Sequence, residues 1–467
     1  MSADPILVLQ LQRMGDLILT FPLLLTLKHL WPEHPIRVVA EPLFFKELVP
    51  LSPEVVFFPP SHCAELSRGQ YATAINLSGR PEAAACLARL TSEHKLGPAA
   101  HSGKTHIYGY WQLYRAALTQ NNRHNAFHWS DLHMLDLQKK PVPQTRHMPA
   151  PLPRAGRVGL VLGASEAAKR PDASFWARLA ARLIKSGTTP VFLGGRAEEA
   201  LGQKVASLAK LPKANLCGRL SITELADVMR SLSLCITPDT GPMHLADWLN
   251  VPVLNLSMGP VHARETGPMS RGRWILRANQ SCAGCWQCRS QPYCKQAFSP
   301  HVVCDIALSL LDNTRDFPTV HHPGLRLFRT GRDSLGLHCL ETAPGSAPSC
   351  RFLLEDFWQA AFLYLHTPDE QNFRHLAQSR LANLYTVFPP LGDRLRKGFA
   401  RLAAGCAQGI KSRDKMLPAN FWRSQPPLIR LFNGHLHMFL QNEDYSPQGW
   451  QTAVDRLTLL SGLFGHI

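Results

Sequence analysis

The feature that most constrains this chain is an alternation of short apolar runs with longer helical stretches, which occurs twice. The apolar runs of strand length lie at residues 6–11, 36–40, 55–58 and 73–77, and again at 158–162, 190–193, 234–237 and 253–256. The stretches of helical pattern between them lie at residues 17–30, 43–49 and 81–90, and again at 174–186, 198–210, 221–231 and 242–250. This order is typical of parallel sheets covered by helices. It predicts an α/β fold with two doubly wound, Rossmann-like sheets.

A proline-rich stretch separates the two series. Five prolines occur between residues 139 and 156, and proline fits neither a helix interior nor a central strand. After about residue 320 the pattern becomes mainly helical. We therefore expect one Rossmann-like domain at 1–150, a second at 151–320, and a helical extension at 321–467.

The charge and apolar content limit the possible partners. The chain of 467 residues has a formal charge of +16, which attracts anions such as phosphorylated molecules, and no dense basic tail that would indicate nucleic-acid binding. We expect no nucleic-acid partner. The longest apolar run, at 17–27, is too short to span a bilayer, and the N-terminus lacks the positive start of a secretory signal. These observations predict a cytoplasmic protein.

The first candidate site follows the first strand. In the turn Arg13-Met14-Gly15-Asp16, Gly15 lets the backbone approach a ligand, and Asp16 would project beyond the strand end. In doubly wound sheets, ligands bind at such strand-to-helix turns. Asp16 alone is equally explained as a helix cap, because a carboxylate favours the positive end of a helix.

The second candidate site is the segment from Thr237 to His244. A strand ends in Asp239-Thr240-Gly241, and a helix follows with Pro242 in its first turn. Free amides at such a helix start bind anions, and Thr240 adds a hydroxyl donor. His244 lies one turn further along the same helix. A simple helix cap would explain Asp239 or Thr240, although not the whole segment.

A third segment has the residues that a diphosphate requires. Gly163-Ala164-Ser165 follows a strand and precedes Lys169 and Arg170, so small residues, a hydroxyl and two cations occur together. A pair of solvated surface cations is the alternative interpretation. The segment from Gly97 to Thr105 resembles a Walker loop, but five residues separate its glycines where four are required. The chain has no Gly-x-Gly-x-x-Gly fingerprint and no Asp-x-Asp pair for a divalent metal.

Five cysteines are concentrated in one short segment, at Cys282, Cys285, Cys288, Cys294 and Cys304. Such a group can hold zinc or an iron–sulfur cluster. The spacings fit neither a zinc ribbon nor a ferredoxin motif. Reduced structural thiols, a metal site and a redox role therefore all remain open, and we expect no cofactor.

Taken together, residues 5–315 resemble glycosyltransferase family 9, the ADP-heptose:lipopolysaccharide heptosyltransferases. The motifs that carry the resemblance are Gly15-Asp16 after the first strand, Gly163-Ala164-Ser165 with Lys169-Arg170, Gly194-Gly195 with Glu198-Glu199, Cys217-Gly218, the block from Asp239 to Ala246, and Gly267-Pro268. The resemblance implies the GT-B fold, with two Rossmann-like domains facing a cleft. It also implies inverting, metal-independent transfer of heptose from ADP-heptose to a lipid A–core acceptor.

Roles follow from the resemblance residue by residue. Asp16 matches the catalytic base, whereas Lys169, Ser165, Thr240 and Gly241 match groups that contact the phosphates. Asp239 and His244 match positions near the donor sugar and phosphates, and Glu198 or Glu199 falls where the family holds the ribose.

Other functions are compatible with parts of this pattern. A different nucleotide-sugar donor and a non-catalytic nucleotide-sugar-binding scaffold protein are the alternatives. Residues 391–415 form a basic amphipathic segment that either contacts anionic lipid at the cytoplasmic face of the inner membrane or is an ordinary solvated helix.

Overall fold

Two mostly parallel sheets organise this computed structural model, which describes residues 3–137, 156–280, 293–312, 317–367, 369–411 and 417–466. The first sheet has the order β3-β2-β1-β4-β5-β6 and the second has the order β13-β12-β11-β10-β9-β7-β8. This arrangement confirms the predicted α/β class with two doubly wound sheets. The proline-rich stretch of the predicted boundary falls almost entirely at 138–155, outside the described residues.

The first sheet is parallel except at one edge. Its strands are β1 (Ile6–Gln10), β2 (Ile36–Ala40), β3 (Val56–Phe58), β4 (Gln70–Asn76), β5 (Thr91–His101) and β6 (Lys104–Tyr108). The helices that follow them are α1 (Met14–Leu30), α2 (Pro42–Leu48), α3 (Cys63–Leu66), α4 (Pro81–Arg89), α5 (Tyr110–Ala117) and α6 (Trp129–Leu135). Strands β5 and β6 pair antiparallel, so the segment from Gly97 to Thr105 is a hairpin. The rejection of a Walker loop there is confirmed.

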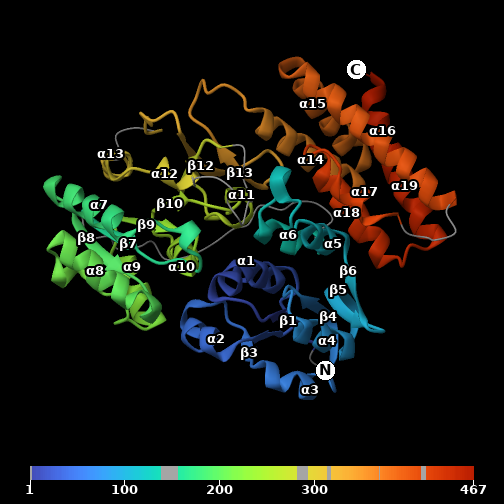
Figure 1. The fold of residues 1–467 in the computed structure, drawn as a ribbon. Helices are drawn as coiled ribbons and strands as arrows, with labels where there is room; N and C mark the ends of the chain where they lie inside the picture. Colours follow the sequence, from blue (N-terminus) through green and yellow to red (C-terminus); the bar gives the residue numbers. More distant parts are fainter. Residues whose placement is uncertain are drawn as a thin grey trace. The chain divides into compact units, whose positions relative to one another are not determined.

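The second sheet carries helices on both faces. Its strands are β7 (Arg157–Val161), β8 (Thr189–Leu193), β9 (Leu234–Pro238), β10 (Val253–Ser257), β11 (Trp274–Ala278), β12 (Leu325–Arg332) and β13 (His338–Glu341). Its helices are α7 (Ala173–Lys185), α8 (Glu199–Ala209), α9 (Ile222–Arg230), α10 (Gly241–Trp248), α11 (Ala263–Thr266), α12 (Tyr293–Gln296) and α13 (Pro300–Leu311). Helices α7, α8 and α13 enclose one buried core with the strands, and Figure 1 shows α7 and α8 side by side. Helix α9 begins at a capping box, which the sequence Ser221-Ile222-Thr223-Glu224 predicts: the Glu224 amide donates to Ser221 Oγ and the Ser221 amide donates to Glu224 Oε2.

Residues 325–341 differ from the expectation of a helical segment after residue 320. They form strands β12 and β13, which pair antiparallel with β11 and with each other. The physical reason is strand pairing: β12 hydrogen-bonds along its length to β11, and five of its eight residues, including Leu325, Leu327 and Phe328, are buried. The helical extension therefore begins with α14 (Cys350–His366).

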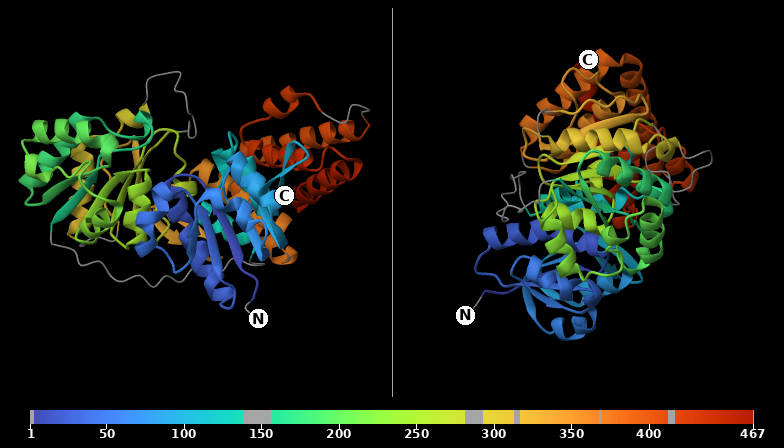
Figure 2. Two further views of the ribbon diagram at one scale, coloured as in Figure 1. Left: turned by 90° about the horizontal axis from the view of Figure 1, so that it is seen from below. Right: turned by 90° about the vertical axis from the view of Figure 1, so that its left-hand side faces the viewer.

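The remaining helices of the extension are α15 (Glu370–Val387), α16 (Pro389–Lys411), α17 (Ala419–Arg423), α18 (Arg430–Asn442) and α19 (Pro447–Ser461). Helices α15, α16 and α19 lie side by side, as the orange and red helices of Figures 1 and 2 show. The extension packs against part of the first half, because the Ile107 amide donates to Asn442 Oδ1 at 2.6 Å and Lys104 pairs with Asp444.

The chain divides into two compact units whose segments come from both halves of the sequence. One contains Gln10–Cys63 with the described part of 143–346, and the other contains Ala64–Val142 with the helical extension. The domain boundaries at 150 and 320 stay a prediction. No helix in the described ranges is long and apolar enough to cross a bilayer.

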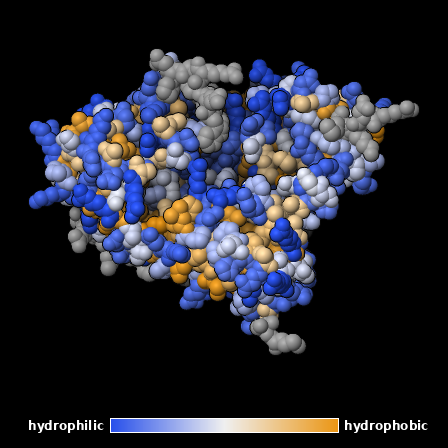
Figure 3. Space-filling model, turned by 60° about the horizontal axis from the view of Figure 1, so that its bottom comes forward, coloured by the Kyte–Doolittle hydropathy of each residue, from blue (hydrophilic) through white to orange (hydrophobic). Residues whose placement is uncertain are grey.

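On the face drawn in Figure 3, apolar side chains form separate patches among hydrophilic ones. Leu43 of α2 is 78% exposed.

Candidate functional site

Helix α1 begins earlier than the sequence predicted and includes Gly15 and Asp16. Arg13 is the N-cap, and its amide donates to Asp16 Oδ2 at 3.2 Å. The predicted turn 13–16 is therefore wrong in detail, because this hydrogen bond folds it into the first helical turn. Asp16 has the capping contact that we considered as its alternative role. One carboxylate oxygen makes this contact, which fixes the direction of the side chain.

The start of α1 lies directly against the start of α10. A Cβ added to Gly15 would come within 2.9 Å of the His244 ring and 3.4 Å of the Gly241 backbone, and a Cβ on Gly241 would meet Met14 at 2.5 Å. A side chain at Gly15 would therefore displace the His244 ring, whereas one at Gly241 would displace only the flexible end of Met14. Further along the same helices, Phe21 and Trp248 make an edge-to-face contact at 5.1 Å. The predicted residues 15, 16, 241 and 244 thus belong to one site, although they lie more than 200 residues apart.

Asp239 lies at the centre of this site. Its side chain is about 10% exposed, its Oδ2 is 3.7 Å from Lys169 Nζ, and its Oδ1 accepts the Thr266 hydroxyl at 3.3 Å. Burial raises the pKa of the Asp239 carboxyl, and the negative charge of Asp16 acts in the same direction, whereas Lys169 and Thr266 lower it. Two carboxyl groups and one cation therefore influence each other at this point.

The start of α10 supplies positive potential beside these groups. Thr240 is the extended N-cap residue and makes no side-chain cap bond, so its hydroxyl is not used to close the helix. Pro242 occupies the first turn, where its missing N–H costs nothing. The helix dipole favours an anion at this end.

A pocket of about 530 Å³ opens next to Thr240. It is formed by the loops at the carboxyl ends of β7 and β8 together with the starts of α9, α10 and α1. The lining residues are Met14, Val161, Gly163, Ala164, Ser165, Arg170, Gly194, Gly195, Ala197, Glu198, Leu220, Ser221, Ile222, Leu225, Thr240 and Pro242. Pockets of roughly 300–1,000 Å³ with a few polar groups are the usual size for small ligands.

Glu198 forms one wall of this pocket, and two glycines make room for it. A Cβ on Gly163 would lie 2.3 Å from Glu198 Cδ, and one on Gly194 would lie 2.7 Å from its Cβ. Glu198 Oε2 accepts the Gly195 amide at 3.0 Å, and Oε1 is 3.9 Å from Arg170. Its neighbour Glu199 lies instead beside Gly218, outside the lining residues. Of the two predicted glutamates, the structure places Glu198 in the pocket.

The structure gathers most of the predicted residues into two adjacent groups. Ser165, Glu198 and Thr240 line the pocket. Asp16 and Lys169 act on the charge of Asp239, and Gly241 and His244 lie against Gly15. The sequence analysis missed Thr266 and the pocket-lining residues Ile222 and Leu225. Thr266 could have been predicted from its position in the connection that follows β10, because the connections after β7, β8 and β9 all carry residues of the site.

Of the five clustered cysteines, the described residues include Cys294 and Cys304. Cys282, Cys285 and Cys288 lie outside the described residues. Cys304 is buried in α13, and burial raises the pKa of its thiol. Within the described ranges, no three side chains of His, Cys, Asp or Glu are placed to share a metal ion.

Comparison with known sequences identifies the family. The family model of "Glycosyltransferase family 9 (heptosyltransferase)" matches residues 61–294, half of the chain. The chain is 30% identical over 165 residues to lipooligosaccharide heptosyltransferase 2 of Campylobacter jejuni, covering 34% of this chain and 51% of that protein. It is 34% identical over 125 residues to lipopolysaccharide heptosyltransferase 1 of Pseudomonas aeruginosa, covering 26% and 34%. The chain thus spans about half the length of these relatives or less.

Solved structures share the fold. "E. coli ADP-heptose lps heptosyltransferase II" superimposes with a TM-score of 0.52 at 19% identity, covering 66% of this chain and 99% of that chain. A glycosyltransferase family 9 protein from Veillonella parvula gives 0.54 at 20% identity, covering 67% and 98%. Asp16 precedes the matched range of the family model, so its assignment depends on the geometry above. From the sequence match, the chain belongs to glycosyltransferase family 9, the heptosyltransferase family.

Proposed function

We propose that this protein is an inverting, metal-independent heptosyltransferase that moves a heptose from ADP-heptose to a lipid A–Kdo lipopolysaccharide core acceptor. Its relatives, named as heptosyltransferases of lipopolysaccharide and lipooligosaccharide, support this substrate class. The observation that carries the proposal is the grouping of Asp16, Asp239, Lys169 and the start of α10 beside one pocket.

The pocket suits the nucleoside part of the donor. Glu198 presents a carboxylate that is 17% exposed and can accept hydroxyl donors, as ribose hydroxyls are. Leu220, Ile222 and Leu225 supply an apolar surface for a base. We assign Ser165 and Thr240, whose hydroxyls line the same pocket, to the phosphates.

Asp16 is the proposed general base. Inverting transfer requires removal of the proton from the acceptor hydroxyl as this hydroxyl attacks the anomeric carbon. Oδ2 of Asp16 is oriented by the Arg13 amide, and its charge is close enough to Asp239 to raise the pKa of that carboxyl. The base therefore lies where we place the donor sugar.

The departing diphosphate gains negative charge during the transfer. Lys169 supplies a cation next to Asp239, and the start of α10 supplies oriented dipoles. Fixed positive groups of this kind stabilise a developing charge in a site shielded from water. Asp239, held by Lys169 and Thr266, is placed to accept hydrogen bonds from the donor sugar.

We place the protein in the cytoplasm, at the periphery of the inner membrane, where its lipid-linked acceptor would be available. The basic face of α16 is the proposed contact with the membrane. We propose no nucleic-acid partner, because the sequence motifs and the site residues are those of a nucleotide-sugar site.

The test is Asp16→Asn in a donor-consumption assay with ADP-heptose and a lipid A–Kdo acceptor. Loss of a general base should lower turnover about 10²–10⁴-fold, while ADP binding measured by calorimetry stays within about twofold. Asp305→Asn, on the exposed surface of α13, is the matched control, with unchanged turnover.

Three outcomes would contradict parts of the proposal. Wild-type protein that binds ADP-sugars without turnover would indicate a binding or scaffold protein. Preference for another nucleotide-sugar in a thermal-shift screen would replace the donor, since a ligand raises the melting temperature of the state it binds. Full activity of Asp16→Asn would remove Asp16 as the base.

A further inference from the structure

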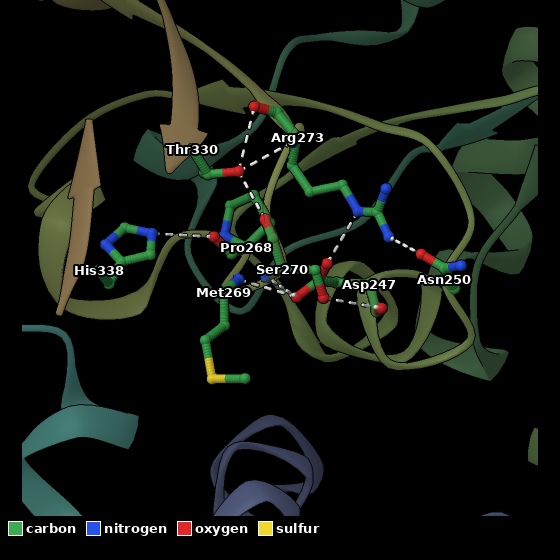
Figure 4. Close-up of polar contacts among 8 residues, drawn as sticks. All are labelled: Asp247, Asn250, Pro268, Met269, Ser270, Arg273, Thr330 and His338. Carbon is green, nitrogen blue, oxygen red and sulfur yellow. Dashed lines mark hydrogen bonds and ion pairs between the residues drawn. The ribbon is translucent and has the colours of Figure 1, made fainter. Parts of the chain in front are cut away.

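Asp247, near the end of α10, binds a loop whose residues do not line the pocket. Its side chain is 5% exposed. Oδ2 accepts the amides of Met269 at 2.8 Å and Ser270 at 3.1 Å, and Oδ1 accepts Arg273 Nε at 3.0 Å. Figure 4 shows these three groups converging on the one carboxylate. A buried carboxylate with this many donors is held in one orientation.

Strand β12 braces the same loop through Arg273. The Arg273 amide donates to Thr330 Oγ1 at 2.8 Å, and the Thr330 hydroxyl donates to the Ser270 carbonyl at 2.5 Å. The Arg273 guanidinium also donates to Asn250 Oδ1 at 2.5 Å (Figure 4). The loop is thereby tied both to the end of α10 and to the sheet.

Strand β13 adds a third support. His338, which is fully buried, lies with Nε2 3.2 Å from the Pro268 carbonyl. Because a carbonyl only accepts, Nε2 carries the proton in this contact. Both β12 and β13 lie beyond the range of the family match, which ends at residue 294.

The supported loop leads directly to Asp239. Helix α11 ends at Thr266, and Gly267 closes it with its amide on the Ala263 carbonyl at 3.0 Å. No side chain fits at this point, since a Cβ on Gly267 would lie 2.3 Å from the same carbonyl. Thr266 is therefore held between α11 and the segment bound by Asp247. Its hydroxyl donates to Asp239 Oδ1.

We propose that Asp247 and Thr266 are positioning residues for the transfer reaction: Asp247 fixes the loop of residues 266–270, and Thr266 on that loop fixes the Asp239 carboxylate toward the donor sugar. This inference rests on the proposed function and deepens it. It also gives the hairpin of β12 and β13 a role, because its Thr330 and His338 hold the same loop.

The proposed positioning role affects binding of the sugar part of the donor and not binding of its nucleotide part. None of the residues 247, 266–270, 330 and 338 lines the pocket, whose walls come from other loops. A loop that loses its support should therefore weaken contacts to the sugar and leave ADP binding intact. A merely structural role for Asp247 would instead lower stability and ADP affinity together.

The experiment compares four variants: Asp247→Asn, Thr266→Val, Thr266→Ser and the double variant Asp247→Asn/Thr266→Val. Each is tested for its affinity for ADP, its affinity for ADP-heptose and its kcat. We expect Asp247→Asn and Thr266→Val each to lose about ten- to hundredfold in kcat and in the preference for ADP-heptose over ADP. Thr266→Ser, which retains the hydroxyl, should keep near wild-type values. The double variant should be no worse than the poorer single variant, because both act through one contact.

Glu355→Gln is the matched control. Glu355 is a buried carboxylate paired with Arg351 Nε at 2.7 Å in α14, in the other unit of the chain. Its replacement should lower the melting temperature without changing kcat. If Asp247→Asn does not fold, Thr266→Val and Thr266→Ser still decide the matter.

The outcomes distinguish this inference from the proposed function. Wild-type protein that binds no ADP-sugar would end both. If the wild-type protein binds ADP-heptose and Thr266→Val shows the same preference for ADP-heptose over ADP, the positioning role alone is overturned. Additive losses in the double variant would also overturn it, since they indicate two independent effects.

Discussion

Asp239 shows at the residue scale how neighbouring groups set the state of one carboxyl. Burial favours its neutral form, and the charge of Asp16 does the same. Lys169 and the Thr266 hydroxyl favour the ionised form, in which the carboxylate can accept hydrogen bonds from a sugar. Lys169 Nζ lies 3.7 Å from Asp239 Oδ2, so the two groups interact as an ion pair.

Replacing Lys169 should therefore change the pH dependence as well as the rate. In Lys169→Gln the pKa of Asp239 rises further, because the cation that lowered it is gone. As the pH falls, Asp239 is then protonated earlier, and the acid side of the kcat profile moves to higher pH. Lys169→Arg retains the positive charge, so the acid side of its kcat profile should lie at the same pH as in the wild-type protein. A pH–rate series of the three proteins checks this, and an unmoved acid side in Lys169→Gln would contradict it.

Helix α16 is the clearest case at the scale of a single element. Its buried face carries Leu395, Phe399 and Leu402. The opposite face carries Arg394, Lys397, Arg401 and Lys411, which are exposed and, among the described residues, have no ion pair. The apolar face is already used in packing, so any contact with lipid would be electrostatic.

Charge reversal on this face tests the membrane contact. Arg394→Glu, Lys397→Glu and Arg401→Glu together should weaken binding to vesicles of anionic phospholipid by at least about a hundredfold, since the loss of each cation costs roughly fivefold and the new carboxylates are repelled. Reversal of Lys204, Lys210 and Lys213, which are exposed on and after α8, is the control and should have little effect. Co-sedimentation at two salt concentrations measures both. Equal binding of the two triple variants would identify α16 as an ordinary solvated helix.

At the scale of the whole molecule, the extension is built into the unit that contains residues 64–142. His366 of α14 stacks on Tyr110 at 5.2 Å and lies edge-on to Trp111 at 5.6 Å. His366 Nε2 is 3.3 Å from His435 Nε2 of α18. Burial, and then the Arg456 charge, lowers the pKa of His366 to about 3, and burial lowers the pKa of His435 well below its ordinary value. The two rings meet as neutral groups.

This arrangement predicts that acid destabilises the protein. Below about pH 6.5 the unfolded chain takes up protons on these histidines while the folded chain does not, so the free energy of unfolding falls as the pH falls. Each histidine contributes up to about 1.4 kcal/mol per pH unit. His366→Phe should reduce this slope by about one histidine's share. Urea unfolding at pH 7, 6 and 5 measures the slope, and an identical slope in both proteins would contradict the prediction.

The sequence predicted the individual strands and helices around the site better than it predicted how they pair and pack. The strands before Gly15, Gly163 and Asp239 were visible because each is a short apolar run that ends in a glycine or a polar turn. The capping box at Ser221 was visible because its hydrogen bonds join residues three apart. Strand β12 was not recognised, since its identity depends on pairing with β11, about 50 residues earlier.

What the sequence determined by itself was local: the alternating strands and helices, the turns that follow them, and the residue types of a nucleotide-sugar site. These depend on contacts within a few residues, which a linear pattern records. Only the tertiary structure decided that Gly15 meets His244, that Glu198 rather than Glu199 forms the pocket wall, and that Thr266 holds Asp239. Those contacts join distant segments. Their formation depends on how the sheets and helices pack, which no single segment specifies.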